Sequence, residues 1–516
     1  MNKIKPILHF AISFCVCVSA NAQTTWNADI APIMYENCTS CHHDGAIAPF
    51  SLMTYNDALD HTTDIKNSVL DGIMPPWNAD ENYMHFTGER VLSEEEINAI
   101  VAWANDGYEE GTGSAPPLPE YSTESQLDTI DMTIVFPVYT ISKNVDEYRR
   151  FVIHSDFTEN QYMQTFELLM DDQSIIHHLS FYFDTTDNSW NSDLMDTMPG
   201  FDANAMTEDN TVMIGGWVPG GYLGQLPPGM AVEIPAGADL VIELHYAPGN
   251  LGNEVQPFIN LQWSRYTSPR LVISDKILKY SPDCLVEPEL FIPANTVQTF
   301  HEIFEGSWGS DVSLIGVMPH MHYLGQTFTI YGKPAGIDSI PLISIDHWDF
   351  HWQNNYIFQK LKHIENGTPI YGVATFDNTE ANEDNPNSPP IDVHAGIHTT
   401  DEMMVGWFTY TSYLPGDEDI VIDSTILDPV SILSIEPSGL NIFPNPVDDE
   451  LQIAVHHFTE NNFTLMIFDL MGRVILTKEI DGDQISGINV SALPSGMYMI
   501  EITDGIKRSA TRFVKL

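Results

Sequence analysis

The stretch IIHHLSFYF, residues 175–183, has the β-branched and aromatic composition of a β-strand. Successive side chains of a strand point to opposite faces, so His177 and His178 should be separated, one in the core and one in solvent. Alternatively, the two histidines share a metal ion, which requires a local twist and different ring nitrogens on the two residues. The stretch alone leaves both alternatives open.

Similar strands fill the middle of the chain. From about residue 125 to 430, short runs of β-forming residues are separated by Gly, Pro, Asn and Asp, and few segments have helical periodicity. This pattern is typical of antiparallel sandwiches, and the length suits two of them in tandem. We expect a multidomain, mainly β protein with jelly-roll-like sandwiches at 125–270 and 271–430.

The overall charge excludes one class of partner. The chain has 72 acidic residues against 20 Lys and Arg, which gives a net charge of −52. Such a surface repels phosphate backbones, so we expect no nucleic-acid binding. The acidic surface would keep an exported protein soluble.

The first 22 residues predict export. They combine a basic start, an apolar run and the small-residue sequence Ala20-Asn21-Ala22, which is typical of a cleaved secretory signal peptide. No later segment has the roughly 18 consecutive apolar residues of a membrane span. We therefore expect an exported protein with no transmembrane segment.

The sequence Cys38-x-x-Cys41-His42 is the attachment pattern of a c-type haem. The two thiols would bond to the haem and His42 would ligate the iron. A zinc site would need a second ligand pair nearby, and a thioredoxin-like site would need a βαβ pattern. Neither is visible in the sequence, so covalent haem is the prediction.

Met74, in the sequence DGIMPPWNAD, is the expected second axial ligand. Met53, Met84 and His85 are alternatives. A capping box formed by Ser93 and Glu96 predicts a closing helix, with Ile97, Ile100 and Val101 on its apolar face. The segment 23–112 resembles a small class I cytochrome c, and a Gly/Pro/Ser-rich linker at 113–124 follows it.

Three further histidines and a methionine pair occur on predicted strands of the middle region. His245 lies in DLVIELHYAPGN, and a lone strand histidine is more often structural. His320 and His322 are two residues apart and therefore share one face of a strand. Met403 and Met404 begin another strand, where paired methionines are usually core residues. Together, however, imidazoles with a thioether favour copper that cycles through Cu(I).

The order HH … HY … HxH-x-LG … DEM resembles the copper type II, ascorbate-dependent monooxygenases, the superfamily of dopamine β-monooxygenase and peptidylglycine α-hydroxylating monooxygenase. The resemblance covers residues 125–425. It implies two copper ions. One copper would be held by His177, His178 and His245, and the other, catalytic copper by His320, His322 and Met403.

The resemblance also implies the reaction. Members of this superfamily hydroxylate a C–H bond of a small organic substrate with O2, two protons and two electrons. The reductant would be ascorbate or another donor, and the fused haem domain is the predicted source of electrons. A redox partner protein is a further candidate partner. The alternative function is a copper-binding or electron-transfer protein with a c-type haem and no enzymatic activity.

Several residues depart from the family pattern. Met318 stands where the peptide-amidating members have an arginine that grips a substrate carboxylate, and Val405 and Trp407 replace an Asn and a Tyr. These replacements favour a less polar substrate than a glycine-terminated peptide. The remaining candidates His351, His394 and His398 are predicted to be structural or surface residues, with His398 nearest the site, and Cys284 to be a buried thiol.

The tail at 437–516 is predicted to be a separate small β-sandwich, since its segments alternate apolar and polar residues. The phrases FPNPV, FDLMGR and LPSGMYMIEI resemble the type IX secretion C-terminal sorting domain of certain Gram-negative bacteria. This resemblance implies passage through the periplasm, handling by the type IX secretion machinery and a secreted or cell-surface location.

Overall fold

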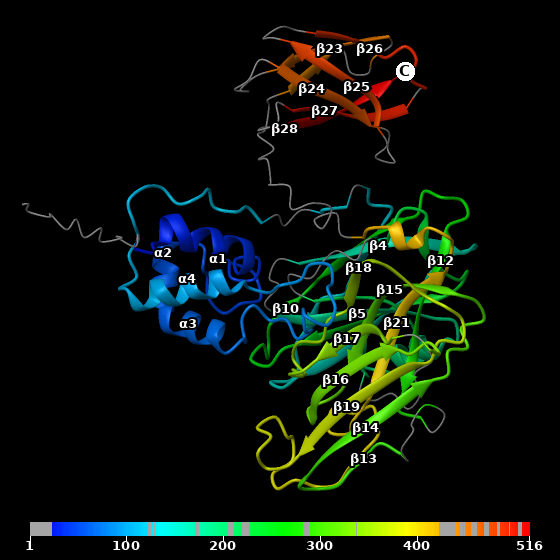
Figure 1. The fold of residues 1–516 in the computed structure, drawn as a ribbon. Helices are drawn as coiled ribbons and strands as arrows, with labels where there is room; N and C mark the ends of the chain where they lie inside the picture. The colour runs from blue at the N-terminus through cyan, green and yellow to red at the C-terminus, as the bar shows by residue number, and fades with distance from the viewer. Residues whose placement is uncertain are drawn as a thin grey trace, which may run out of the picture. The chain divides into compact units, whose positions relative to one another are not determined.

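The computed structural model describes residues 23–422 and 440–515, with gaps. The gaps are 122–124, 128, 171–174, 204–210, 219–225, 282–283, 285–288 and 337 in the first range, and 444–446, 448, 456–461, 469–473, 482–485, 495 and 504–507 in the second. The chain forms two compact units, one ending at Asp423 and the other beginning at Ser424 (Figure 1). The predicted signal peptide, 1–22, and residues 122–124 of the predicted linker lie outside the described residues.

The first unit begins with a small helical domain, drawn in blue in Figure 1. Its helices are η1 (Trp26–Ile30), α1 (Ala31–Asn37), α2 (Tyr55–Asp60), α3 (Thr62–Leu70) and α4 (Glu94–Asn105). Trp26, Ile100 and Trp103 are fully buried in its core. The predicted capping box at the start of α4 is confirmed, because Ser93 and Glu96 each accept the other's backbone N–H.

The remainder of the first unit is almost entirely β-strand, which confirms the mainly β prediction for the middle of the chain. Its strands are β1 (Met132–Val135), β2 (Tyr139–Thr140), β3 (Glu147–Ile153), β4 (Gln161–Leu169), β5 (Ile176–Asp184), β6 (Phe201–Asp202), β7 (Val212–Trp217), β8 (Met230–Ile234), β9 (Asp239–Tyr246), β10 (Glu254–Val255), β11 (Phe258–Trp263), β12 (Arg270–Lys279), β13 (Phe291–Ile292), β14 (Thr296–Phe304), β15 (Val312–His320), β16 (Gly325–Gly332), β17 (Ile340–Ile345), β18 (Tyr356–Ile364), β19 (Ile370–Asn378), β20 (Val393–His394) and β21 (Val405–Ser412). Two short helices, α5 (Asn188–Met195) and η4 (Asp417–Asp419), accompany them.

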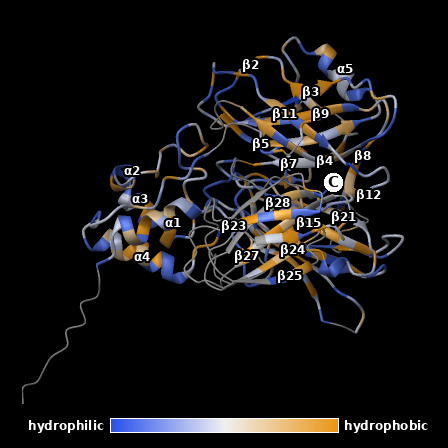
Figure 2. Ribbon diagram, turned by 90° about the horizontal axis from the view of Figure 1, so that it is seen from above, coloured by the Kyte–Doolittle hydropathy of each residue, from blue (hydrophilic) through white to orange (hydrophobic). Residues whose placement is uncertain are grey.

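Three sheets form two sandwiches around separate hydrophobic cores. An eight-stranded sheet, β1-β11-β4-β8-β12-β21-β15-β18, contributes to both cores. The five-stranded sheet β6-β3-β9-β5-β7 encloses the first core with it, and the four-stranded sheet β14-β19-β16-β17 encloses the second. Figure 2 shows apolar residues concentrated along these strands.

The shared sheet makes the two halves less separate than tandem sandwiches would be. They join where β8 and β12 pair in parallel, with Met230 opposite Arg270. The boundary predicted between residues 270 and 271 therefore falls at the beginning of β12. Alternating polarity indicates which residues of a strand are buried but not which strand pairs with it. The sequence could therefore not predict the parallel pairing of β8 with β12.

Residues 77–90, which connect α3 to α4, leave the helical domain and pack on the second sandwich. We call this segment the strap. The backbone N–H groups of Asp80 and Thr87 donate to the carbonyls of Ser344 and Ile357, at 2.8 Å each. Phe86 is fully buried in the second core. The predicted cytochrome segment 23–112 thus contains a piece that belongs structurally to the β-region.

The second unit has two sheets of its own, β22-β23-β26 and β25-β24-β27-β28, around an apolar core. Its strands are β22 (Leu440–Phe443), β23 (Glu450–Val455), β24 (Asn462–Phe468), β25 (Val474–Asp481), β26 (Ser486–Asn489), β27 (Gly496–Thr503) and β28 (Arg508–Lys515). In the described parts of both units, no helix is long and apolar enough to cross a membrane.

Candidate metal centres

The histidine pair that opened the sequence analysis lies at a β-bulge. In β5, the pairing with β9 shifts register between Ile176 and His178, which leaves His177 as the extra residue. A bulge turns the side chain of the extra residue away from strict alternation. His177 and His178 therefore converge, and His245 of β9 lies directly opposite His178.

The three imidazoles are close enough to share one ion. His178 Nδ1 lies 3.4 Å from His177 Nδ1 and 3.2 Å from His245 Nδ1. Their ligand atoms all lie within 4.8 Å of one another. Both neighbouring histidines present the same ring nitrogen, Nδ1, so the expectation of different nitrogens is not met. The local twist it required is present as the bulge.

The surroundings favour the neutral form of His177 and His178, which is the form that binds metal. Burial, with the charge of His245 as a smaller cause, lowers the pKa of His177 to about 4 and also lowers the pKa of His178 well below its usual range. His245 Nε2 donates to Asp146 Oδ1 at 2.8 Å, and this bond lowers the pKa of Asp146. Since Nε2 of His245 is engaged, its Nδ1 is directed at the cluster, as in many carboxylate–histidine–metal arrangements.

The second set lies at the end of β15 and just before β21. His320 Nδ1 bonds to Gln353 Oε1, and His322 Nδ1 donates to the carbonyl of Asp401 at 2.9 Å. The ring centroids of His320 and His322 are 5.1 Å apart. Burial lowers the pKa of His320 to about 3 and also lowers that of His322. Both rings are therefore neutral, with Nε2 available as a ligand atom.

The two methionines occupy different environments. Met403 lines the same cavity as His320 and His322, whereas Met404 is fully buried in the second hydrophobic core. The position of Met403 is held by Glu402, whose buried carboxylate accepts the backbone N–H groups of His322, Leu324 and Met403 at 2.7–3.1 Å. Burial raises the pKa of Glu402 to about 8 despite these donors.

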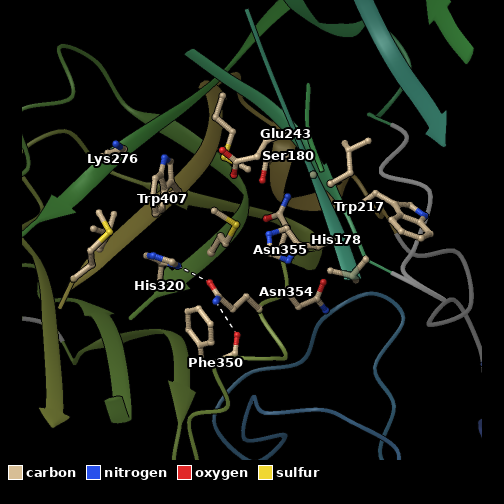
Figure 3. A pocket seen from close by; sticks show the side chains of 18 of the residues that line it. His178, Ser180, Trp217, Glu243, Lys276, His320, Phe350, Asn354, Asn355 and Trp407 are labelled. Atoms are coloured by element: carbon tan, nitrogen blue, oxygen red, sulfur yellow. Dashed lines mark hydrogen bonds between the residues drawn. The ribbon is translucent and has the colours of Figure 1, made fainter. Parts of the chain in front are cut away.

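Both sets adjoin one cavity of about 540 Å³. It is lined by His178 from the first set and by His320, His322 and Met403 from the second. Figure 3 shows His320 with Trp407 and Lys276 toward one side, and His178 with Trp217 and Ser180 toward the other. The strap contributes Trp77, Thr87, Gly88 and Arg90 to the wall. The volume is typical of a small-molecule site.

The helical domain has the residues that a covalent haem needs. Cys38 and Cys41 are partly exposed free thiols, and His42 Nδ1 donates to the carbonyl of Phe50 at 3.0 Å, which leaves Nε2 for iron. Met74 is 40% exposed in the connection after α3. His61, which the sequence analysis did not consider, stacks on Phe50 at 3.7 Å, and its charge contributes to lowering the pKa of His42 after burial.

The other candidates are distributed as follows. His398 lines the cavity, as its sequence position suggested, and His351 lies with its ring 6.4 Å from that of His177. His394 is exposed and contacts Phe291 outside the cavity. Cys284 is buried. The sequence analysis missed Asp146, Gln353 and Glu402, and only Glu402 had a signal, since it belongs to the DEM sequence.

Two family models match the ends of the chain. Residues 27–103 match cytochrome c oxidase, cbb3-type, subunit III, and residues 441–515 match a secretion system C-terminal sorting domain. An endo-acting ulvan lyase from Formosa agariphila is 34% identical over 85 residues, which is 16% of this chain and 16% of the lyase. The chain thus spans a small part of that relative's length.

Two solved structures show only a distant likeness. PNGase F, a glycosylasparaginase from Flavobacterium meningosepticum, has 9% identity and a TM-score of 0.23, over 55% of this chain and 96% of that chain. A β-glucuronidase from Faecalibacterium prausnitzii has 12% identity and a TM-score of 0.13, over 49% and 47%. Likeness at this level carries no argument about the activity of the middle region.

The matches at the two ends agree with the motifs and with the local structure. The chain therefore carries a cytochrome c domain at its N-terminal end, which implies haem c, and a C-terminal sorting domain that directs export through type IX secretion to the cell surface or the medium.

Proposed function

We propose that the protein is an exported copper-dependent monooxygenase that hydroxylates a C–H bond of a small organic substrate, with electrons supplied through the fused haem domain. The observation that carries this proposal is the convergence of two separate ligand sets on one cavity. The balanced reaction is R–H + O2 + 2 e⁻ + 2 H⁺ → R–OH + H2O. When bound, two copper ions and the haem would supply the one-electron redox steps that this reaction needs.

The donor sets suit copper. Three imidazole nitrogens directed at one point repel one another unless a cation lies between them, and imidazole is a good ligand for copper. In the second set, the thioether of Met403 adds a soft donor that stabilises Cu(I). Zinc sites more often contain thiolate or carboxylate ligands. These chemical preferences favour copper at both sets.

The residues around the second set would fix the orientation of its ligands, so that a bound copper ion could react with O2. Gln353 and the Asp401 carbonyl fix the orientation of His320 and His322, so that Nε2 of each ring is the remaining donor. Glu402 ties the end of β15 to the Met403 backbone through three hydrogen bonds. The cavity beside this set would hold the substrate, and the first set, with Asp146 behind it, would store the second electron.

The position of the strap favours the haem domain as the electron donor. Trp77 lines the cavity and follows Met74, the predicted axial ligand, by three residues. Its ring contacts that of Tyr356 of β18, with centroids 5.3 Å apart. The chain segment that follows the predicted axial ligand is thereby anchored at the cavity wall. Ascorbate or a redox partner protein would then reduce the haem, or the copper directly.

The relay and the oxygenation can be tested separately. In rapid mixing, the reduced, copper-loaded protein with a substrate and O2 should reoxidise its haem much faster than the copper-free protein. His322→Ala should remove this acceleration. His394→Ala, which replaces an exposed histidine outside the cavity, should not.

The product of the same mixture decides between the enzyme and the alternative, a copper-binding electron-transfer protein. Incorporation of one atom from labelled O2 into an organic product identifies a monooxygenase. Rapid reoxidation without labelled product would favour the electron-transfer protein. Reoxidation that is independent of copper would contradict the relay itself.

A further inference from the structure

The cavity has a charge balance opposite to that of the chain. Four of the 20 lysines and arginines line it, and among the described residues Glu243 is the one carboxylate in its wall, although the chain has 72 acidic residues. The four basic residues are Arg90, Arg150, Lys276 and Lys279. Arg150 bonds to Glu243 at 2.7 Å, so this pair is neutral overall. Of the other basic residues, Lys276 and Lys279 form no ion pair within the described part of the chain, so the described wall has an excess of positive charge.

Lys276 is placed next to the candidate catalytic set. In the shared sheet, Lys276 of β12 lies opposite Trp407 of β21, and Trp407 lies opposite Met318 of β15. The three side chains form a row on the face that lines the cavity, two residues along β15 from His320. Lys276 Nζ lies 5.0 Å from the Trp407 ring centroid, and that ring lies 5.8 Å from the ring of His320.

The lysine is available for a ligand. In the part of the chain that the structure describes, Lys276 forms no ion pair; its ammonium group lies over the face of Trp407, and its charge is a minor cause of the lowered pKa of His320. Its side chain is exposed where the cavity opens. A lysine next to low-dielectric aromatic walls attracts an anion more strongly than one on an open surface does.

The rest of the wall accommodates an apolar body. Trp77, Trp217, Trp407 and Phe350 contribute aromatic surface. A cation would be disfavoured here, because the one carboxylate of the described wall is already paired with Arg150. An uncharged ligand would gain only from the aromatic surface.

We propose that this cavity binds a small organic carboxylate with an aromatic or apolar body, whose carboxylate pairs with Lys276. Apolar residues such as Met318 led the sequence analysis to expect a less polar substrate; the cation in this proposal, Lys276, lies instead on β12, two strands away in the sheet from Met318. The identity of this ligand as the substrate rests on the proposed function, whereas its binding does not.

Three probes with the same body test the binding. Phenylacetate, phenylacetamide and phenethylamine carry an anionic, a neutral and a cationic head group. Each is titrated calorimetrically into the mature haem-containing protein without copper, so that no metal can attract the carboxylate. Phenylacetate should bind at least about tenfold more tightly than the amide, and the amine should bind most weakly.

The variants identify the group responsible. Lys276→Met keeps the aliphatic stem over Trp407 and should abolish the preference for phenylacetate, and Lys276→Arg should retain it. Lys333→Met replaces an exposed lysine outside the cavity and should leave the preference unchanged. Circular dichroism of each variant establishes that it is folded.

Three outcomes would overturn the proposal. They are equal affinity for the three probes, tighter binding of the amine, and no binding of any probe at millimolar concentration. A preference that survives in Lys276→Met would overturn the assignment to that lysine. Anion selectivity in a protein that takes up no copper would instead contradict the proposed function and leave the carboxylate site established.

Discussion

His177 shows that one extra residue in a strand can change which side chains lie together. Period-two alternation separates neighbouring strand residues, yet one extra residue in β5 brings His177 and His178 together. A bulge depends on the partner strand, so composition alone could not choose between the two alternatives for this pair. The HxH spacing predicted His320 and His322 on one face of a strand; β15 ends at His320, so His322 lies just beyond the strand, yet both side chains line the cavity.

Glu302 provides a residue-scale prediction about pH. This glutamate of β14 is fully buried opposite Gly372, and neither carboxylate oxygen has a hydrogen-bond partner among the described residues. Burial raises its pKa from 4.5 to about 9. The folded state therefore keeps the proton that the unfolded state releases, and stability falls as the pH rises from about 4.5 to 9.

Replacement of Glu302 by an apolar residue should remove this loss of stability at higher pH. Relative to the native protein, Glu302→Leu should gain about 1.4 kcal/mol of unfolding free energy for each pH unit between pH 5 and 8. Urea unfolding at several pH values measures it. Glu305→Leu, at an exposed position just beyond β14, is the control. A gain independent of pH would show that Glu302 is ionised when folded.

At the scale of elements, the strap is the part that the sequence analysis did not anticipate. Its sequence reads as a loop inside a cytochrome segment, because its apolar residues are few and irregularly spaced. The partner that buries them is formed by β17 and β18, more than 250 residues later in the chain. Local patterns cannot report such a contact, nor the parallel pairing of β8 with β12.

Phe86→Ala should loosen the strap from the second sandwich. Phe86 packs against Tyr356 and Phe358, with ring centroids 5.2 and 5.4 Å apart. Loss of a buried phenylalanine costs about 3–5 kcal/mol. We expect a lower unfolding midpoint by tryptophan fluorescence and faster proteolysis within residues 77–90. Val297→Ala, at an exposed position on β14, should change little. Equal behaviour of the two variants would mean that the strap does not contribute to the second core.

At the scale of the whole molecule, the domain organisation was largely predictable from the sequence. The haem motif, the mainly β middle and the sorting tail each have local signatures, and the family matches at the two ends agree with them. The shared cavity was not visible, because it is formed by residues from the strap, from β3, β5, β7 and β9, and from β12, β15, β18 and β21. The candidate ligands were identified in the sequence, but only the folded structure shows that both sets adjoin one cavity.

The second unit should be dispensable for the chemistry. The first unit has its own hydrophobic cores, and all the candidate ligands lie in it. A chain that ends at Asp423 should keep the thermal unfolding midpoint, the haem content and the metal content of the longer protein. Calorimetry and metal analysis of the two chains measure this. A large loss of stability in the shorter chain would show that the tail supports the first unit.

The central claim is that two copper sites adjoin one cavity in a protein that also holds a haem. The most direct measurement is copper and iron per chain in the mature protein, loaded with copper under reducing conditions, beside Met403→Leu and Met404→Leu. We predict two coppers and one iron in the native protein and in Met404→Leu, which exchanges a core methionine for a residue of similar volume. Met403→Leu should fall toward one copper. One iron without tightly bound copper in the native protein would contradict the account and leave a cytochrome joined to a β-scaffold.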